Sequence, residues 1–516
     1  MGKNMKKVAF RNLGCKVNEY EMEYMQQRMV EKGYSFVPFD TKADIYVVNT
    51  CTVTNIADRK SRQMLHKAKK LNPEAIVVAV GCYVQTDTKG AMADPAIDIL
   101  IGNNLKSQIA EIIEEYVSKR DAAKQSNPGG RDGTDAASVD VKSLNVQDLT
   151  GRDGTDAASV DVKSLNVQDL TTPVEYENMH ISKTAEHTRA FVKIQDGCNQ
   201  FCSYCAIPLA RGRIRSRKLE DILEEINDLA NNGYQEVVLT GIHLSSYGLD
   251  FHPDENGRIR SYNETILINE NRNVNENVSI STSRNDNENG YISKNGYVNY
   301  DLLEVINKVA DIDRIKRIRL GSLEPRLITE EFLSQLSKVD KLCPHFHLSL
   351  QSGCIDTLKR MNRHYTPAEF KNGVELLRRY FNDPAITTDV IVGFPGETED
   401  EFAATKAFLE DIQFFELHVF KYSRRRNTVA DRLPNQVLDA DKDIRSDILL
   451  ALDEELSEAF RLRYIGREVE VLFEEFKDGM YVGHTKEYIF VKMASDTDLR
   501  GQIRTLVLDG KTLNFA

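Results

Sequence analysis

The chain has 516 residues, enough for about three domains of ordinary size. Hydrophobic residues make up 41% and charged residues 28%, which is a globular composition. The net charge of -12 excludes a protein that is cationic over its whole surface, although local basic patches are compatible with it. No apolar run reaches the about 18 residues of a membrane span, and residues 1–10 lack the apolar core of a secretory signal. We therefore expect a cytoplasmic protein without a membrane partner, in which eight cysteines favour metal or redox chemistry over disulfides.

The first part of the chain alternates short apolar segments with helical patterns. Strands are predicted at 8–13, 45–49 and 76–80, and helices at 19–30 and 58–71. This alternation predicts an α/β domain with a doubly wound parallel sheet over residues 1–118.

A direct repeat follows this domain. Residues 130–150 recur letter for letter at 151–171, and each copy of 21 residues carries four Asp against one Arg and one Lys. Two copies are too few for a solenoid, and large apolar residues are scarce. We therefore expect residues 119–183 to be a disordered linker, with a binding module as the alternative.

The alternation of strands and helices resumes at residue 189 and runs to 422. Six strands are predicted, at 190–195, 236–240, 315–320, 345–350, 387–392 and 416–422. Six such units in series predict a barrel or an open partial barrel, which we place at 184–440. An insert at 252–299 has 12 Asn in 48 residues and no usable period, so we expect a long surface loop.

The last part of the chain, 441–516, is predicted to hold a helix and a small β domain. An acidic helical pattern covers 439–463, and short β-type segments with interspersed glycines come after it. This pattern predicts a small all-β barrel. Residues 464–516 carry seven Lys or Arg against nine Asp or Glu, which weakens the expectation that this domain alone holds a nucleic acid.

A cysteine motif directly follows the first predicted strand of the second series. Cys198, Cys202 and Cys205 form a C-x3-C-x2-C pattern on a loop at the strand's carboxyl end, where such barrels carry their active sites. Three thiolates do not complete a tetrahedral zinc site, but in a cubane iron–sulfur cluster they leave one iron open to a ligand. The alternative is a zinc loop completed by a distant histidine, such as His187 or His243.

Three further cysteines each follow a predicted strand of the first domain: Cys15, Cys51 and Cys82. Because the carboxyl ends of parallel strands meet at the same edge of a sheet, we expect these residues to converge. Convergence predicts a second three-thiolate cluster with an open iron. The alternative is three buried free cysteines, which are common in protein cores.

The Cys198 loop, with the aromatic Tyr204 before its last cysteine, resembles the signature of the radical S-adenosylmethionine superfamily. The segments LGCKVN, NTCTVT and GCY around the other three cysteines make nearly the whole chain resemble the methylthiotransferase family. TGIHLSSYG, LGSLEP and residues 345–353 resemble its MtaB branch. The resemblance implies a central partial (β/α)6 radical-SAM barrel and a C-terminal TRAM-like barrel that binds nucleic acid.

The resemblance also implies an activity, namely methylthiolation of C2 of N6-threonylcarbamoyladenosine next to the tRNA anticodon. Its cofactors are two [4Fe-4S] clusters and S-adenosylmethionine. The cluster on Cys198, Cys202 and Cys205 binds S-adenosylmethionine and yields a 5′-deoxyadenosyl radical, and the cluster on the other three cysteines delivers the sulfur. An aromatic C2–H has no useful acidity, so a radical route is plausible where acid–base chemistry is not. The implied cofactor contacts are Tyr204, Gly241, Gln351, Asp389 and Gly393.

The implied partners are tRNA and an electron donor of the flavodoxin or ferredoxin type, with the enzyme a monomer. Four alternatives stay open. The same chemistry acts on isopentenyladenosine in tRNA in the MiaB branch, and on a ribosomal protein aspartate in the RimO branch. The chain could also be a radical enzyme that has lost methylthio transfer, or a non-enzymatic iron–sulfur sensor.

Basic residues supply candidate contacts to the substrate. Six Lys or Arg between residues 59 and 70 form a patch on a predicted helix, which suits RNA phosphates. Arginines at 211, 213, 215 and 217 line one face if that stretch is extended, and solvated faces are the alternative for both groups. A third basic group ends the last predicted strand. Asn427 follows it, at a position where the family usually has glycine. Asn tolerates a positive φ, so we expect the same turn. The candidates are Arg59, Lys60, Arg62, Arg213, Arg215, Arg424 and Arg425.

Overall fold

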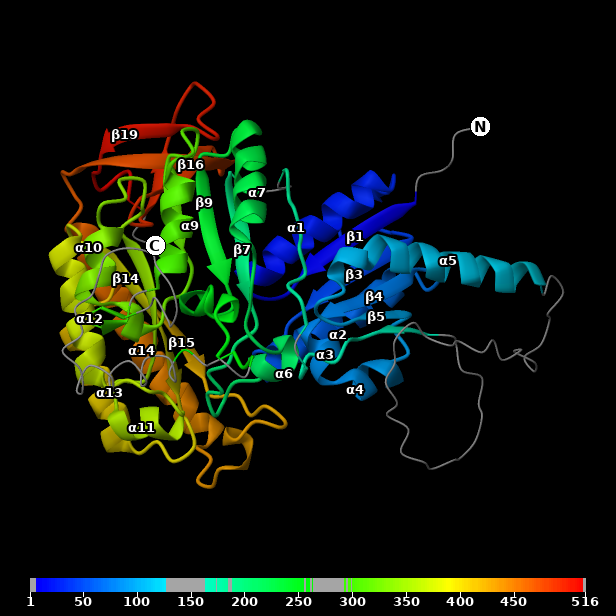
Figure 1. Cartoon of the computed structure of the whole chain (residues 1–516), viewed down its shortest axis with the longest axis horizontal. Helices are drawn as coiled ribbons and strands as arrows, with labels where there is room; N and C mark the ends of the chain where they lie inside the picture. The colour runs from blue at the N-terminus through cyan, green and yellow to red at the C-terminus, as the bar shows by residue number, and fades with distance from the viewer. Residues whose placement is uncertain are drawn as a thin grey trace. The chain divides into compact units, whose positions relative to one another are not determined.

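The computed structural model describes residues 6–126, 163–172, 174–183, 188–254, 257–259, 262, 292–293, 296–297 and 299–513. The chain divides into two compact units (Figure 1). The first comprises Met1–Ile181 and Ala206–Arg213, and the second comprises Ser182–Cys205 and Ile214–Ala516. Within the described part, no helix has the length and apolar character needed to cross a membrane.

The first unit is built on a six-stranded parallel sheet with the order β2-β1-β3-β4-β5-β6. Its strands are β1 (Lys7–Asn12), β2 (Ser35–Phe36), β3 (Ile45–Thr50), β4 (Ile76–Gly81), β5 (Ile99–Ile101) and β6 (Ser164–Asn166). Every residue of β3 and β4 is buried, as expected for central strands covered on both faces. The predicted parallel sheet is therefore confirmed.

Helices cover both faces of this sheet. They are α1 (Lys16–Glu31), α2 (Asn55–Leu71), α3 (Cys82–Thr86), α4 (Thr88–Ala93), the short 3-10 helix η1 (Lys106–Gln108), α5 (Ile109–Ser126) and α6 (Ile207–Arg211). Apolar residues of α1 and α5 pack on one face, and those of α2, α3 and α4 pack on the other. Alternate strand residues supply the two cores, because successive side chains of a strand point to opposite faces.

Strand β6 lies in the second copy of the direct repeat, within the segment whose composition predicts a linker. Ser164, Leu165 and Asn166 pair in parallel with β5, and Leu170 is buried. The corresponding residues of the first copy lie outside the described part. Leu165 and Val167 of the second copy pack against the apolar core on one face of the sheet, so this part of the repeat belongs to the first unit.

The second unit carries two sheets of βα units. The first has the order β12-β9-β7-β8 and the second β13-β14-β15, and all pairs are parallel except β7 with β8. The strands are β7 (Arg189–Asp196), β8 (Arg215–Ser216), β9 (Glu236–Gly241), β12 (Arg317–Leu320), β13 (His345–Gln351), β14 (Ala385–Val392) and β15 (Glu416–Lys421). Isolated bridges such as Leu323 with Leu348 join the sheets. The closure of six strands into one barrel stays a prediction.

Helices of the second unit alternate with these strands. They are α7 (Leu219–Asn231), α9 (Tyr300–Ala310), α10 (Glu330–Leu336), α11 (Ile355–Arg360), α12 (Pro367–Tyr380) and α13 (Glu399–Ile412), with 3-10 turns η2 (Leu244–Ser246), η3 (Leu249–Phe251), η4 (Pro325–Leu327) and η5 (Ala430–Arg432). Of the Asn-rich insert, the structure describes a short hairpin, β10 (Ile292–Ser293) with β11 (Gly296–Tyr297). Strand residues such as Val192, Leu348 and Val390 pack with the helices in one apolar core, whereas their chain neighbours Lys193, His347 and Asp389 face the opposite way.

The C-terminal part of the second unit is a helix followed by an antiparallel sheet. Helix α14 (Asp439–Leu462) precedes strands β16 (Glu468–Lys477), β17 (Met480–Thr485), β18 (Phe490–Met493) and β19 (Ile503–Val507), in the order β18-β17-β16-β19. Arg317 of β12 donates to the carbonyl oxygens of His484 (3.0 Å) and Glu470 (2.8 Å), which anchors this sheet to the βα units. The α/β class and the all-β C-terminal sheet are thus confirmed.

Candidate active site

Three cysteines of the second unit lie on the loop that follows β7. The strand ends at Asp196, and Gly197 turns the chain with a φ of 70°. Cys198 is buried, and Cys202 and Cys205 are half-buried. Burial, together with the neighbouring thiols of Cys202 and Cys205, raises the pKa of Cys198 well above its usual value. All three cysteines lie on one short loop at the carboxyl end of β7.

Backbone hydrogen bonds hold this cysteine loop in place. The amide of Ser203 donates to the carbonyl of Met361 (2.9 Å), and the amide of Ala430 donates to the carbonyl of Ser203 (2.8 Å). The Ser203 hydroxyl donates to the carbonyl of Arg360 (2.7 Å). Because these partners are backbone groups, the loop conformation depends on the fold of α11 and η5 more than on particular side chains.

A buried cation lies beside the cysteine loop. Arg363 donates through Nη1 to Cys202 Sγ (3.3 Å) and through Nη2 to Glu324 Oε2 (2.9 Å). Burial raises the pKa of Glu324, but the charge of Arg363 and hydrogen bonds from His243 and Arg363 outweigh burial and hold it below the usual value. Glu324 therefore stays ionised and fixes Arg363, which donates a hydrogen bond to Cys202 Sγ. No motif or spacing in the sequence indicates Arg363, and Glu324 stands out only as part of the segment LGSLEP.

The three cysteines of the first unit stand where parallel strands end. Cys15 is the N-cap residue of α1, Cys51 follows β3, and Cys82 follows β4 and begins α3. Burial and then the like charges of Cys82 and Cys15 raise the pKa of Cys51 to about 12. Asn103 donates to Cys82 Sγ (3.4 Å). Cys51 and Cys82 directly follow Thr50 and Gly81, which are register partners in neighbouring strands, and Asn18 of the helix that Cys15 caps donates to the carbonyl of Thr50 (3.0 Å).

Both cysteine sets fit an iron–sulfur cubane with one open iron. Each supplies three thiols from one small region, and thiolates are the ligands of such clusters. Binding releases the thiol protons, and the positive charge of the metal compensates for the burial that otherwise disfavours the thiolates of Cys51 and Cys198. Both ring nitrogens of His243 have other partners, Ser246 Oγ (2.6 Å) and Glu324 Oε2 (3.4 Å), which argues against a zinc role. His187, the other candidate, lies outside the described residues.

The candidate cofactor contacts fall into two groups. Gly241 ends β9, Gln351 ends β13 with a φ of 71°, and Gly393 follows β14 with a φ of 70°. They occupy strand ends, as does the cysteine loop after β7. Tyr204 lies on that loop, and its ring centroid is 6.4 Å from that of Phe394. Asp389 differs, since it lies in the middle of β14.

The predicted basic patch is present on α2. Arg59, Lys60 and Arg62 are exposed, whereas Lys67 and Lys69 form ion pairs with Asp40 and Asp98. Within the described part of the chain, Arg59 and Lys60 have no carboxylate within ion-pair distance. The exposed charges are therefore available to an anionic partner.

The predicted row of arginines from 211 to 217 is wrong. Helix α6 ends at Arg211, Gly212 has a φ of 71°, and only Arg215–Ser216 is extended. Three of the four side chains are buried: Arg211 bonds Glu21, Arg215 lies 3.6 Å from Asp196, and Arg217 pairs with Glu225. Arg213 is half-buried. The alternation of arginines does not place their side chains on one face, because a helix and a glycine turn interrupt the stretch.

The basic group after β15 is divided between the interior and the surface. Arg425 is buried, whereas Arg424 is exposed and pairs with Asp431 (2.9 Å). Asn427 has a φ of 69°, which confirms that it takes the conformation expected of a glycine.

Comparisons with known proteins match nearly the whole chain. Residues 7–102 match the family described as "Uncharacterized protein family UPF0004", and residues 192–409 match the Radical SAM superfamily. The chain is 34% identical to "Threonylcarbamoyladenosine tRNA methylthiotransferase MtaB" of Bacillus subtilis, over 97% of this chain and 93% of that protein. It is 32% identical to the protein of the same name of Aquifex aeolicus, over 97% and 100%. It is 30% identical to "tRNA-2-methylthio-N(6)-dimethylallyladenosine synthase" of Thermodesulfovibrio yellowstonii, over 95% and 93%.

Proposed function

The chain belongs to the radical S-adenosylmethionine methylthiotransferase family, and on this premise we propose that it methylthiolates N6-threonylcarbamoyladenosine in tRNA. The relatives named MtaB support this substrate, since their sequences are somewhat more identical to this chain than that of the relative named for dimethylallyladenosine. The observation that carries the chemistry is the presence of two three-cysteine sets, one in each unit, each at the carboxyl ends of parallel strands.

The residues that hold the cofactors follow from this arrangement. Cys15, Cys51 and Cys82 would hold one [4Fe-4S] cluster, and Cys198, Cys202 and Cys205 would hold the other together with S-adenosylmethionine. When bound, these groups supply the radical that removes hydrogen from adenine C2 and the sulfur that replaces it. The chain's own contribution is to position the groups and to exclude water.

Arg363 has a positioning role in this proposal. Its guanidinium donates to Cys202 Sγ and is itself held by the buried Glu324 carboxylate. A fixed cation next to a ligand thiolate offsets the negative charge that a cluster and its thiolates accumulate. Near the end of β14, the amide of Gly393 donates to Glu397 (2.6 Å), and Arg445 donates to the same carboxylate oxygen (2.7 Å). This network fixes the turn that is our candidate contact for the cofactor's nucleoside.

The substrate's phosphates would bind the patch of Arg59, Lys60 and Arg62 on α2. The C-terminal sheet contributes shape more than charge, because residues 464–516 have more acidic than basic side chains. Arg424, Arg425, Arg213 and Arg215 remain weaker candidates, since burial or ion pairs engage three of them.

We also propose that the enzyme is a monomer in the cytoplasm, where tRNA is present. Its electron donor is of the flavodoxin or ferredoxin type, since one-electron reduction of a cluster starts the chemistry of this superfamily.

Mass spectrometry of tRNA nucleosides from cells with and without the gene tests the substrate. We expect the methylthio form of threonylcarbamoyladenosine to disappear with the gene and to return with the wild-type chain but not with Cys202→Ala. Persistence of that nucleoside, in a strain without a second gene of this family, would reject the proposal. Loss of the methylthio form of isopentenyladenosine instead, or of the modified ribosomal aspartate, would assign the MiaB-like or the RimO-like substrate.

A second assay separates the enzyme from an iron–sulfur sensor. The anaerobically reconstituted and reduced chain should cleave S-adenosylmethionine to 5′-deoxyadenosine. A chain that holds both clusters but forms no 5′-deoxyadenosine would be a sensor or binding protein.

A further inference from the structure

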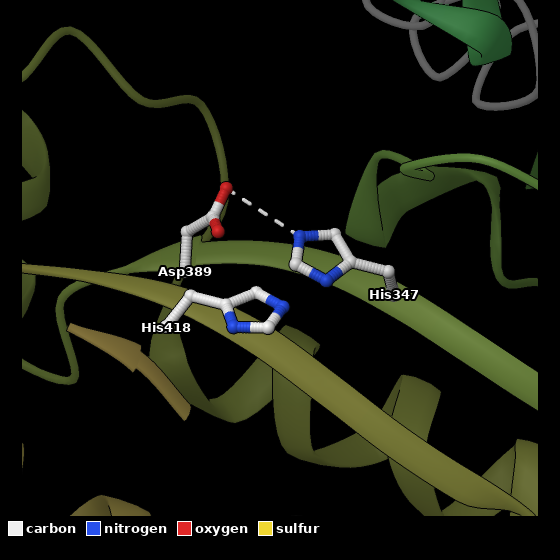
Figure 2. A group of neighbouring side chains, drawn as sticks. All are labelled: His347, Asp389 and His418. Carbon is white, nitrogen blue, oxygen red and sulfur yellow. Dashed lines mark ion pairs between the residues drawn. The ribbon is translucent and has the colours of Figure 1, made fainter. Parts of the chain in front are cut away.

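Two histidines and an aspartate gather on neighbouring strands of the second unit. His347 of β13, Asp389 of β14 and His418 of β15 turn their side chains toward one another, as Figure 2 shows. One potential ligand atom from each residue lies within 4.8 Å of those from the other two. Asp389 and His418 are direct register partners, and His347 is the partner of Thr387, two residues before Asp389. The sheet register itself therefore builds the cluster.

Hydrogen bonding orients His347 toward the aspartate. Its Nδ1 lies 2.9 Å from the hydroxyl oxygen of Thr387, which is 2% exposed, and its Nε2 lies 3.4 Å from Asp389 Oδ2. In the tautomer that donates Nδ1–H to Thr387, Nε2 presents its lone pair to the carboxylate. Two acceptors then face each other, an arrangement that a cation between them stabilises.

The distances suit a metal of the zinc class. Ligand atoms about 2.1 Å from a tetrahedral ion lie about 3.4 Å apart, which is the separation of His347 Nε2 and Asp389 Oδ2. His418 stacks on His347 with ring centroids 5.4 Å apart, and its side chain is 41% exposed, so a small rotation brings it to the same ion. Glu416 Oε1 lies 3.8 Å from His418 Nδ1, which is outside hydrogen-bond distance.

We propose that His347, Asp389 and His418 form a binding site for a divalent cation of the zinc or iron(II) class. Two imidazoles and one carboxylate are a ligand set typical of these ions, and three protein ligands leave a position open to water or to a substrate oxygen. The site is distinct from both cysteine sets, and it does not depend on the proposed function. It reassigns Asp389, which the family resemblance implies to be a cofactor contact.

Zinc binding to the full chain tests the site. The chain is first reconstituted with iron and sulfide, so that clusters occupy the cysteines, and is then dialysed anaerobically against buffers of stepped free Zn²⁺. We expect one zinc per chain, with X-ray absorption at the zinc edge showing nitrogen and oxygen ligands at about 2.0–2.1 Å. His347→Gln, Asp389→Asn and His418→Gln should each weaken binding by at least about 100-fold, since each removes one of three ligands.

Conservative variants separate ligand loss from misfolding. Thr387→Val keeps all three ligands and removes the group that orients His347, so binding should weaken by about 10- to 100-fold, and Thr387→Ser should retain it. His252→Gln removes an exposed histidine that pairs with Asp301 outside the cluster, and should leave zinc binding unchanged. Iron content and the melting temperature identify any variant that has not folded.

Two outcomes overturn the proposal. One is zinc uptake that is the same in the wild type and in all three ligand variants. The other is a zinc ion with sulfur ligands at about 2.3 Å, which would place the metal on cysteines. In either case the contact between His347 and Asp389 would be part of the sheet's polar packing and no metal site.

Discussion

Replacing Arg211 with methionine removes one of two cations that neutralise a buried carboxylate in the first unit. Arg211 is 1% exposed and donates to both oxygens of Glu21 (2.8 and 3.0 Å) and to Asn18 Oδ1 (2.6 Å). Lys106 pairs with the same Glu21. Asn18 in turn donates to the carbonyl of Thr50 (3.0 Å), the residue before Cys51. The network therefore reaches the backbone around the cysteine set.

The expected loss in the free energy of unfolding follows from the balance of buried charges around Glu21. Breaking a buried ion pair by removing one partner costs about 3–5 kcal/mol. We expect the lower end, about 3 kcal/mol, for Arg211→Met, because Lys106 still neutralises Glu21. Glu21→Gln should cost more, since it leaves two buried cations, Arg211 and Lys106, without their anion. That Glu21→Gln loses more stability than Arg211→Met is a more specific prediction than either value alone.

Urea unfolding of the reconstituted full chain, followed by circular dichroism, measures the effect. With a urea dependence of about 2 kcal/mol per molar for a unit of this size, a loss of 3 kcal/mol lowers the midpoint by about 1.5 M. Lys60→Met, an exposed change in the same unit, is the control and should stay within about 0.5 kcal/mol. A shift for Arg211→Met no larger than that control, or a smaller loss for Glu21→Gln than for Arg211→Met, would refute the reasoning.

Three further predictions concern the cofactors, pH and tRNA. Cys202→Ala should abolish 5′-deoxyadenosine formation and lower iron by about half, and loss of all iron would contradict independent cysteine sets. Burial raises the pKa of Asp453 to about 6, so ionisation of this carboxyl destabilises the folded chain as the pH rises from about 4 to 6. Asp453→Asn should therefore raise the melting temperature more at pH 8 than at pH 5. An equal gain at both pH values would be evidence against this reasoning. Joint reversal of Arg59, Lys60 and Arg62 to Glu should weaken tRNA binding and flatten its salt dependence, whereas Lys371→Glu, on α12, should not.

Much of the fold is visible in the sequence because buried strands of a parallel sheet are continuous apolar runs. β3 and β4 are buried at every residue, and their ends fall within a residue or so of the predicted ones. The convergence of Cys51 and Cys82 follows from that topology alone, since parallel strands end at one edge. The positive φ of Asn427 is also visible in the sequence, because it follows from the local conformational preference of Asn.

The remaining features depend on contacts between distant residues. Arg363 meets Cys202 across 161 positions and Glu324 across 39, so no spacing reveals that network. Strand β6 repeats the sequence of an earlier segment, and it pairs with β5, whose residues lie 65 positions earlier in the chain. The cluster of His347, Asp389 and His418 needs the register of three strands, which sequence periodicity does not give.

The interleaving of the two units along the chain has a consequence for biosynthesis. Residues Ala206–Arg213 belong to the first unit, although 24 residues of the second unit precede them. A ribosome must therefore translate beyond Arg213 before the N-terminal sheet acquires its last helix and the second of the two counter-charges for Glu21. A nascent chain that stalls before that point would expose an incompletely neutralised carboxylate, and a single protease cut between the units would not release two intact halves.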